Sequence, residues 1–214
     1  MWRRNGLTIA MASLFALCWA GQAAAGFRHE LEERREHGRP PIAFTAYLGS
    51  GGFWESTAEN WESEFLQMAA FVWLTAFLRQ KGSSQSRPLH GEAESDRAPR
   101  PRAGAPWPVH RGGLLLALYE RSLTLALVGL FALSFALHAV AGHAAYAEEQ
   151  AIHGEPRASL LGYVASNRFW LESLQNWQSE FMAVGAIVVL SVFLRQRGSP
   201  KSKPVDASHA ETGA

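Results

Sequence analysis

The sequence predicts an all-α membrane protein with four transmembrane helices, arranged as two tandem duplicated helical hairpins with pseudo-two-fold symmetry. Two observations carry this prediction. Apolar runs alternate with strongly polar connectors, and the whole pattern of runs and connectors occurs twice. A soluble protein of this size would interleave apolar and polar residues more evenly, at helical or strand spacing.

The duplication is most visible in a tryptophan-bearing string. Residues 60–65 (NWESEF) return as residues 176–181 (NWQSEF), an offset of 116 positions (176 − 60). The same offset holds without a gap for residues 7–88, where about 36 of about 82 aligned pairs are identical. Identity at this level over an ungapped stretch indicates a duplicated segment.

The first apolar run is the first predicted span. Residues 7–25 carry no charge, and about 19 residues suffice for a helix to cross a hydrocarbon core of roughly 30 Å. The basic start and small-residue end also fit a secretory signal peptide. The counterpart of this run, residues 123–141, lies mid-chain and cannot be a cleaved signal. We therefore interpret residues 7–25 as a retained transmembrane helix.

The second span of each repeat is less apolar. Residues 65–78 give only about 14 apolar positions, so the helix needs residues 54–64 to cross a bilayer. Opposite charges three and four apart over residues 29–39 predict a solvated helical extension of the first span, which Pro40 and Pro41 end. The predicted organisation is a first repeat at 1–82 (spans about 7–25 and 54–79), a disordered linker at 83–113, a second repeat at 114–198 (spans about 122–142 and 170–195) and a disordered tail at 199–214.

Positive charge predicts the orientation. Two spans per repeat give both repeats the same orientation, with the N-terminus, the linker and the C-terminus on one side. Lys and Arg mark the cytoplasmic side, and unbalanced ones are concentrated in these three segments: Arg3, Arg4, Arg79, Lys81, Arg87, Arg97, Arg100, Arg102, Arg111, Arg121, Arg195, Arg197, Lys201 and Lys203. We expect a multi-pass protein of the bacterial cytoplasmic (inner) membrane with both termini in the cytoplasm.

Composition argues against several classes of function. A net charge of +1 offers no basic field for nucleic acid. The single Cys18 excludes an intrachain disulfide and a multi-cysteine metal site. The sequence has no phosphate-binding glycine loop and no nucleophile with a plausible histidine partner. We therefore predict a protein that is not an enzyme and has no cofactor.

The repeated string supplies a candidate polar site. Its Asn and Glu are four positions apart, so they share a helix face, and Ser lies beside them. A carboxylate near hydrocarbon must face protein or water. Two hypotheses remain open: a proton or cation site, or a structural cap that fixes packing between the repeats. The candidate residues are Asn60, Ser63, Glu64, Asn176, Ser179 and Glu180.

Aromatic and basic residues at the helix ends suggest anchoring. Tryptophans at headgroup level form an aromatic belt more simply than a ligand cage, and the basic helix ends can snorkel or recognise anionic lipid. The predicted interfacial anchors are Trp54, Trp61, Trp170, Trp177, Arg79 and Arg195.

Three histidines bear on other hypotheses. His138, near the end of the third span, could ligate haem with one other histidine, but its counterpart is Gln22, so this possible ligand pairing is not repeated. His37 and His153 do repeat, each before a glycine in a connector, where a solvated turn or a pH-sensitive or metal-binding patch is expected.

The paired motif FW…NW(E/Q)SEF, an apolar helix and LRQ(K/R)GS resembles a family of small bacterial integral membrane proteins classified only as a domain of unknown function. The resemblance covers residues 3 to about 204 and departs only in the long linker. It implies a membrane protein and no particular activity. Three hypotheses for function follow: a structural or interaction component, a small proton or cation channel or transporter that uses Glu64 and Glu180, and a haem-carrying subunit. Expected partners are the lipid bilayer and a second copy in a homodimer, with no nucleic acid.

Overall fold

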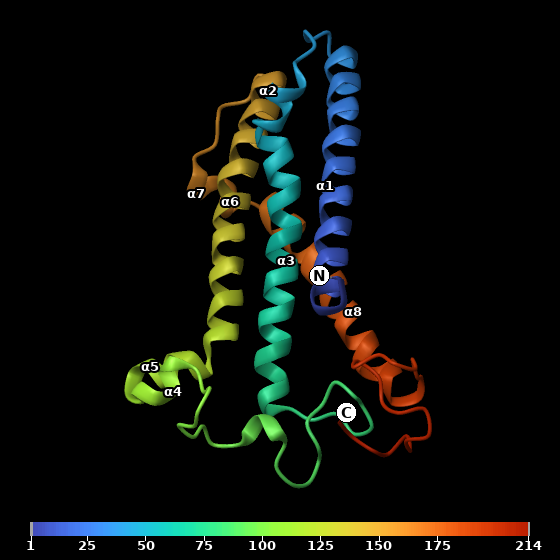
Figure 1. Ribbon diagram of the computed structural model, residues 1–214. Coiled ribbons are helices and arrows are strands. Elements are labelled where there is room, and N and C mark those ends of the chain that lie inside the picture. The colour runs from blue at the N-terminus through green and yellow to red at the C-terminus, as the bar shows by residue number, and fades with distance from the viewer. Residues whose placement is uncertain (1, 214) are drawn as a thin grey trace. The chain divides into compact units, whose positions relative to one another are not determined.

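The structure is a computed structural model that describes residues 2–213, and in this range it contains helices and no strand (Figure 1). The elements are α1 (Trp2–Glu36), α2 (Phe44–Leu48), α3 (Gly51–Phe77), a short 3-10 helix η1 (Glu94–Asp96), α4 (Trp107–Arg111), α5 (Gly113–Glu120), α6 (Ser122–His153), α7 (Leu160–Val164) and α8 (Asn167–Phe193). The all-helical class expected from the sequence is confirmed.

The helix boundaries follow the sequence repeat. Adding the offset of 116 to α2 gives residues 160–164, which are α7, and adding it to α3 gives residues 167–193, which are α8. The first helices of the two repeats, α1 and α6, end at Glu36 and His153, one position apart under the same offset. Each sequence copy therefore forms a long helix, a five-residue helix and a second long helix.

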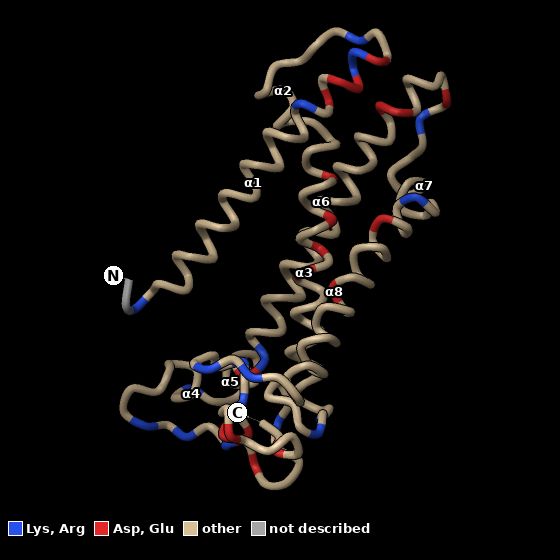
Figure 2. The backbone as a smooth tube through the Cα atoms, turned by 90° about the vertical axis from the view of Figure 1, so that its right-hand side faces the viewer, with Lys and Arg blue, Asp and Glu red and all other residues tan. Residues whose placement is uncertain are grey.

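Three helices among the described residues are long and apolar enough to cross a membrane: Arg4–Glu36, Ser122–His153 and Asn167–Phe193. The sequence predicted a fourth span, which α3 would provide. Helix α3 is not among these three helices, and its first half carries four carboxylates (Glu55, Glu59, Glu62 and Glu64). Figure 2 shows the contrast with α1, which has no charged residue between Arg4 and Arg28.

The chain divides into two compact units that cut across the long helices. The first comprises the chain up to Ala58 together with Leu137–Phe169. The second comprises Glu59–Ala136 together with Trp170 and the residues after it. Each of the helices α3, α6 and α8 has one segment in the first unit and another segment in the second unit.

The core of the first unit contains the same contact between a tyrosine and a phenylalanine in both repeats. Tyr47 and Phe53 are buried with ring centroids 5.5 Å apart, and their counterparts Tyr163 and Phe169 are buried at the same 5.5 Å. Both tyrosines belong to the five-residue helices and both phenylalanines to the start of the following long helix. The short helices α2 and α7 therefore place an aromatic ring against the helix that comes next in the chain.

Charged residues gather at the end of the first unit where α1 and α6 finish (Figure 2). Arg34 bonds Glu30 one turn earlier at 2.5 Å and Glu148 of α6 at 3.1 Å, and Arg39 also pairs with Glu148. Arg168 pairs with Glu149. Ion pairs with this exposure contribute little energy individually, but the two pairs of Glu148 link segments that are more than a hundred residues apart.

In the second unit the C-terminal tail folds back on the end of α8. The Lys203 ammonium is buried and donates to the carbonyls of Ser208, His209 and Glu211. Burial, followed by the charge of Arg195, lowers the pKa of Lys203. Arg195 donates to three carbonyls at the C-terminal end of α8, which stabilises groups that have no helical partner.

Candidate functional site

The serines of the repeated string bond to their own helices. Ser63 Oγ donates to the Asn60 carbonyl at 2.8 Å, and Ser179 Oγ donates to the Asn176 carbonyl at 2.8 Å. The amide of Asn176 donates to the carbonyl one turn earlier at 3.2 Å. These bonds satisfy polar groups within a helix, and they do not join the two copies of the string.

The two predicted carboxylates have different surroundings. Glu64 is exposed, whereas Glu180 is half-buried. Both belong to the second unit. Carboxylates of this kind are what the sequence hypothesis of a proton or cation site requires.

A carboxylate that sequence reasoning passed over makes the direct contact between the two strings. Glu62 has no exposed surface, and its Oε1 accepts a hydrogen bond at 2.8 Å from the indole Nε1 of Trp177. Both residues belong to the second unit. A bond to a charged acceptor is worth about 1.5–3 kcal/mol. One signal in the sequence could have identified Glu62: it is the one position of the six-residue string at which the copies differ, Glu62 against Gln178.

The predicted tryptophan anchors have partners inside the protein. Trp54 Nε1 donates to the Leu48 carbonyl at 3.0 Å, which ties the start of α3 to the end of α2. Trp170 and Trp177 stack edge to face with centroids 6.2 Å apart. Trp170 keeps 40% of its surface exposed. Arg79 is exposed and Arg195 is half-buried.

The three histidines considered in the sequence, His37, His138 and His153, lie in two places in the first unit. His138 has no exposed surface and stacks on Phe169, with ring centroids 4.7 Å apart. His37 and His153, the repeated pair, line one cavity of about 280 Å³. Four carboxylates and two guanidinium groups share the lining of this cavity: Glu30, Glu33, Glu148, Glu149, Arg39 and Arg168.

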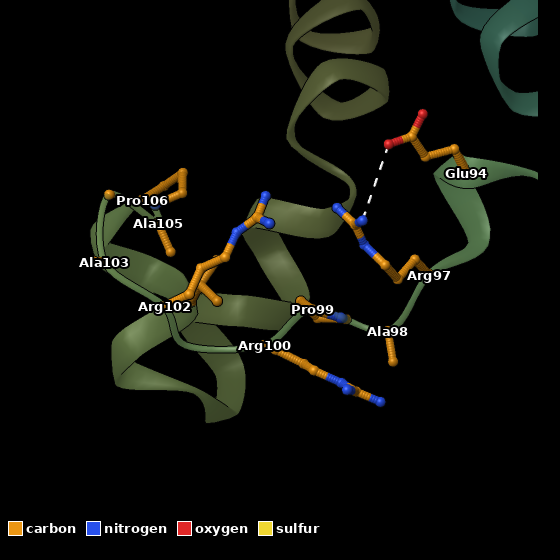
Figure 3. Close-up of a pocket in the computed structure, with 11 residues that line it drawn as sticks. Glu94, Arg97, Ala98, Pro99, Arg100, Arg102, Ala103, Ala105 and Pro106 are labelled. Atoms are coloured by element: carbon orange, nitrogen blue, oxygen red, sulfur yellow. Dashed lines mark ion pairs between the residues drawn. The ribbon is translucent and has the colours of Figure 1, made fainter.

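The linker in the second unit forms an arginine-rich cavity of about 730 Å³ (Figure 3). Arg97 points toward Glu94, with 3.9 Å between guanidinium and carboxylate, while Arg100 points away from that pair. Prolines and small residues form most of the remaining lining. The cavity is basic and open, and its chemistry would suit an anionic group.

A family model described as a domain of unknown function (DUF6766) matches residues 1–214. The chain belongs to this family. No curated protein and no solved structure gives a significant match. The resemblance indicated by the tryptophan motif is therefore confirmed.

The description of the DUF6766 family names no functional residues, so the positions of the side chains in the structure indicate the candidates. The sequence motif pointed to Glu64 and Glu180, and the structure adds Glu62 as the buried carboxylate of the same string. The family description assigns no activity that would choose between a structural and a transport role.

Proposed function

We propose that the protein is a structural or interaction component of the bacterial cytoplasmic membrane, without catalysis. In this proposal four helices span the bilayer as two tandem hairpins related by a pseudo-two-fold axis. The N-terminus, the linker and the C-terminus lie in the cytoplasm. The bilayer is its main partner, and a homodimer would bury polar surface that the single chain leaves exposed.

The length and register of α3 support a fourth span. At 27 residues and 1.5 Å per residue the helix is about 40 Å long, more than a hydrocarbon core of roughly 30 Å requires. It has the same length and repeat position as α8, which is long and apolar enough to cross. The carboxylates of α3 oppose its insertion into the bilayer. One of them, Glu62, has a hydrogen-bond partner, which reduces the cost of burying it.

The hydrogen bond between Glu62 and Trp177 is the main observation in favour of a structural role. Polar residues inside membrane proteins either serve a transported species or hold helices together. Here the fully buried carboxylate of the repeated string accepts from an indole of the other copy. An indole N–H cannot carry a proton or a cation along a path, so this contact supports packing.

Ion flux into liposomes tests the proposal. Purified full-length protein is reconstituted, and proton, K⁺ and Na⁺ fluxes are compared with those of empty liposomes and of the double variant E64Q/E180Q. A structural component gives the background flux in every sample. Flux above background that disappears in E64Q/E180Q would overturn the proposal.

The second candidate, a proton or cation channel or transporter, is favoured by one observation. Glu64 and Glu180 occupy the same position in the two copies of the repeated string, and carboxylates within membrane helices commonly mark proton or ion pathways. The flux measurement decides between the candidates, because only transport depends on these two carboxylates.

A further inference from the structure

Three ionisable side chains from three helices come together in the first unit. Glu55 belongs to α3, His138 to α6 and Tyr163 to α7. The Tyr163 hydroxyl donates to Glu55 Oε1 at 3.1 Å. The ligand atoms of Glu55 and His138 lie within 4.8 Å of each other, and both His138 and Tyr163 are 0% exposed.

A glycine allows this close approach. A Cβ added at Gly142, one helical turn after His138, would lie 2.2 Å from the Tyr163 hydroxyl and 2.8 Å from Glu55 Oε1. Real Cβ atoms do not tolerate such distances, so the phenol and the carboxylate rest directly against the backbone of α6. Glycine is used where a backbone must be approached this closely.

The first repeat contains the same scaffold. A Cβ at Gly26 would lie 2.0 Å from the Tyr47 hydroxyl. Gly142 and Tyr163 are the counterparts of these two residues, and they approach each other similarly closely in the second repeat. The glycine and the tyrosine are therefore part of how each copy packs.

The ionisable groups are not part of that shared scaffold. The first repeat has Gln22 in place of His138, and its amide donates to two hydroxyls of α3 at 3.2 and 3.3 Å. The second repeat has Leu171 in place of Glu55. Because one hairpin packs with a neutral amide, packing does not need the buried imidazole, and burying ionisable groups is costly without a use.

The donor set identifies a class of ligand. Imidazole nitrogen with carboxylate oxygen is a preferred combination for Zn²⁺ and similar divalent transition metals, whereas Mg²⁺ and Ca²⁺ prefer oxygen alone. A hydroxyl that donates to a ligating carboxylate is the kind of outer partner that fixes its orientation. Two donors on one tetrahedral ion at about 2.1 Å are about 3.4 Å apart, which small side-chain rotations would reach from the present separation.

We propose that Glu55 and His138 bind one divalent transition-metal ion of the Zn²⁺ class per chain. Tyr163 is the positioning residue, since its hydroxyl orients the Glu55 carboxylate. Water or further side chains complete the coordination. The site requires the second repeat's histidine together with the first repeat's glutamate, so neither copy alone would form it.

Metal binding by the full-length protein in detergent tests the proposal. After removal of any polyhistidine tag and of bound metal, the protein is equilibrated with Zn²⁺ or Mg²⁺, and bound metal is measured by elemental mass spectrometry. We expect about one Zn²⁺ per chain and no Mg²⁺. His138→Gln, which introduces the residue of the first repeat, and Glu55→Gln should each weaken binding by more than tenfold. Tyr163→Phe should weaken it by about 10–100-fold.

His29→Gln is the matched control, because it removes an exposed histidine of the same unit. It should bind like the wild type. Thermal unfolding with and without Zn²⁺ separates loss of the site from loss of the fold: Zn²⁺ should raise the Tm of wild type but not of a folded His138→Gln variant. Folded wild type that binds no Zn²⁺, or His138→Gln that binds it as wild type does, overturns the proposal. Unchanged binding by Tyr163→Phe overturns the orienting role.

Discussion

At the scale of residues, positions where the two repeats differ carry as much information as positions where they agree. The sequence identified Glu64 and Glu180 because both copies contain them. The buried carboxylate is Glu62, whose counterpart is Gln178. Periodicity places a side chain on a helix face, but it does not say which segment more than a hundred residues away packs against that face.

The bond between Glu62 and Trp177 gives a prediction for stability. Replacing Glu62 by Leu leaves the indole N–H of the half-buried Trp177 without this acceptor, so we expect the free energy of unfolding to fall by about 1–3 kcal/mol. Glu62→Gln keeps an acceptor oxygen and should cost less. Thermal unfolding in detergent measures both effects. The control is Gln178→Leu at the exposed counterpart position, and a cost equal to that of Glu62→Leu would contradict the assignment.

The close contact between Gly26 and Tyr47 gives a second prediction. Gly26→Ala places a methyl group where the Tyr47 hydroxyl lies, so we expect a loss of about 1–3 kcal/mol from overpacking. Removing the hydroxyl with Tyr47→Phe in the same chain should restore part of that loss. Gly21→Ala, which meets nothing within 4 Å, should be neutral or stabilising. Equal unfolding temperatures for all three variants would refute the contact.

Tyr47 also predicts a response to alkali. Burial, and secondarily the charge of Glu30, raises the pKa of its phenol above the usual 10.0. The folded state therefore disfavours tyrosinate. The stability due to the neutral phenol is fully present below pH 10 and is lost as pH rises through the raised folded pKa. The difference in tyrosinate absorbance between wild type and Tyr47→Phe should titrate above pH 10, and titration below that value would contradict the buried environment.

At the scale of elements, the sequence predicted the long helices, and the repeat predicted their spacing, whereas the short helices η1 and α4 lie within residues 83–113, where a disordered linker was predicted. The first apolar run becomes part of α1, which continues to Glu36 as the alternating charges of the connector suggest. Residues 44–48 form α2, whose Tyr47 packs into a core. The role of Tyr47 was not predictable, because it depends on Gly26, which lies 21 positions earlier.

The pair α4 and α5 gives a prediction at this scale. Helix α5 carries four exposed apolar side chains: Leu114, Leu115, Leu118 and Tyr119. Positions three and four apart lie on the same side of a helix, so these side chains form one stripe. Arg111 lies over the ring of the exposed Trp107, 5.6 Å from its centroid. An exposed apolar stripe with flanking arginines is typical of a helix that lies in a membrane interface.

We therefore expect the stripe to sit in lipid when the protein is in a bilayer. A spin label at position 114, in a chain with Cys18→Ser, should be more accessible to oxygen than to a water-soluble nickel reagent in nanodiscs that contain anionic lipid. A label at position 104, in the open linker, is the control and should show the reverse. Equal accessibility at both positions would contradict an interfacial helix.

At the scale of the whole molecule, three helices long and apolar enough to cross a bilayer support a membrane protein. The fourth span depends on α3, which is not among the helices that length and hydropathy select and which carries four carboxylates in its first half. Pairing between distant segments, such as Arg34 with Glu148, was beyond sequence reasoning, since charge patterns alone do not choose partners.

The side on which the linker lies tests the four-span account most directly. If α3 crosses the membrane, the linker returns to the side of the N-terminus; if only three helices cross, the linker stays on the opposite side. Fluorescent-protein and alkaline-phosphatase reporters are inserted after His90 in living bacteria. The account predicts fluorescence and no phosphatase activity at this position, and a phosphatase-active, non-fluorescent linker would contradict it.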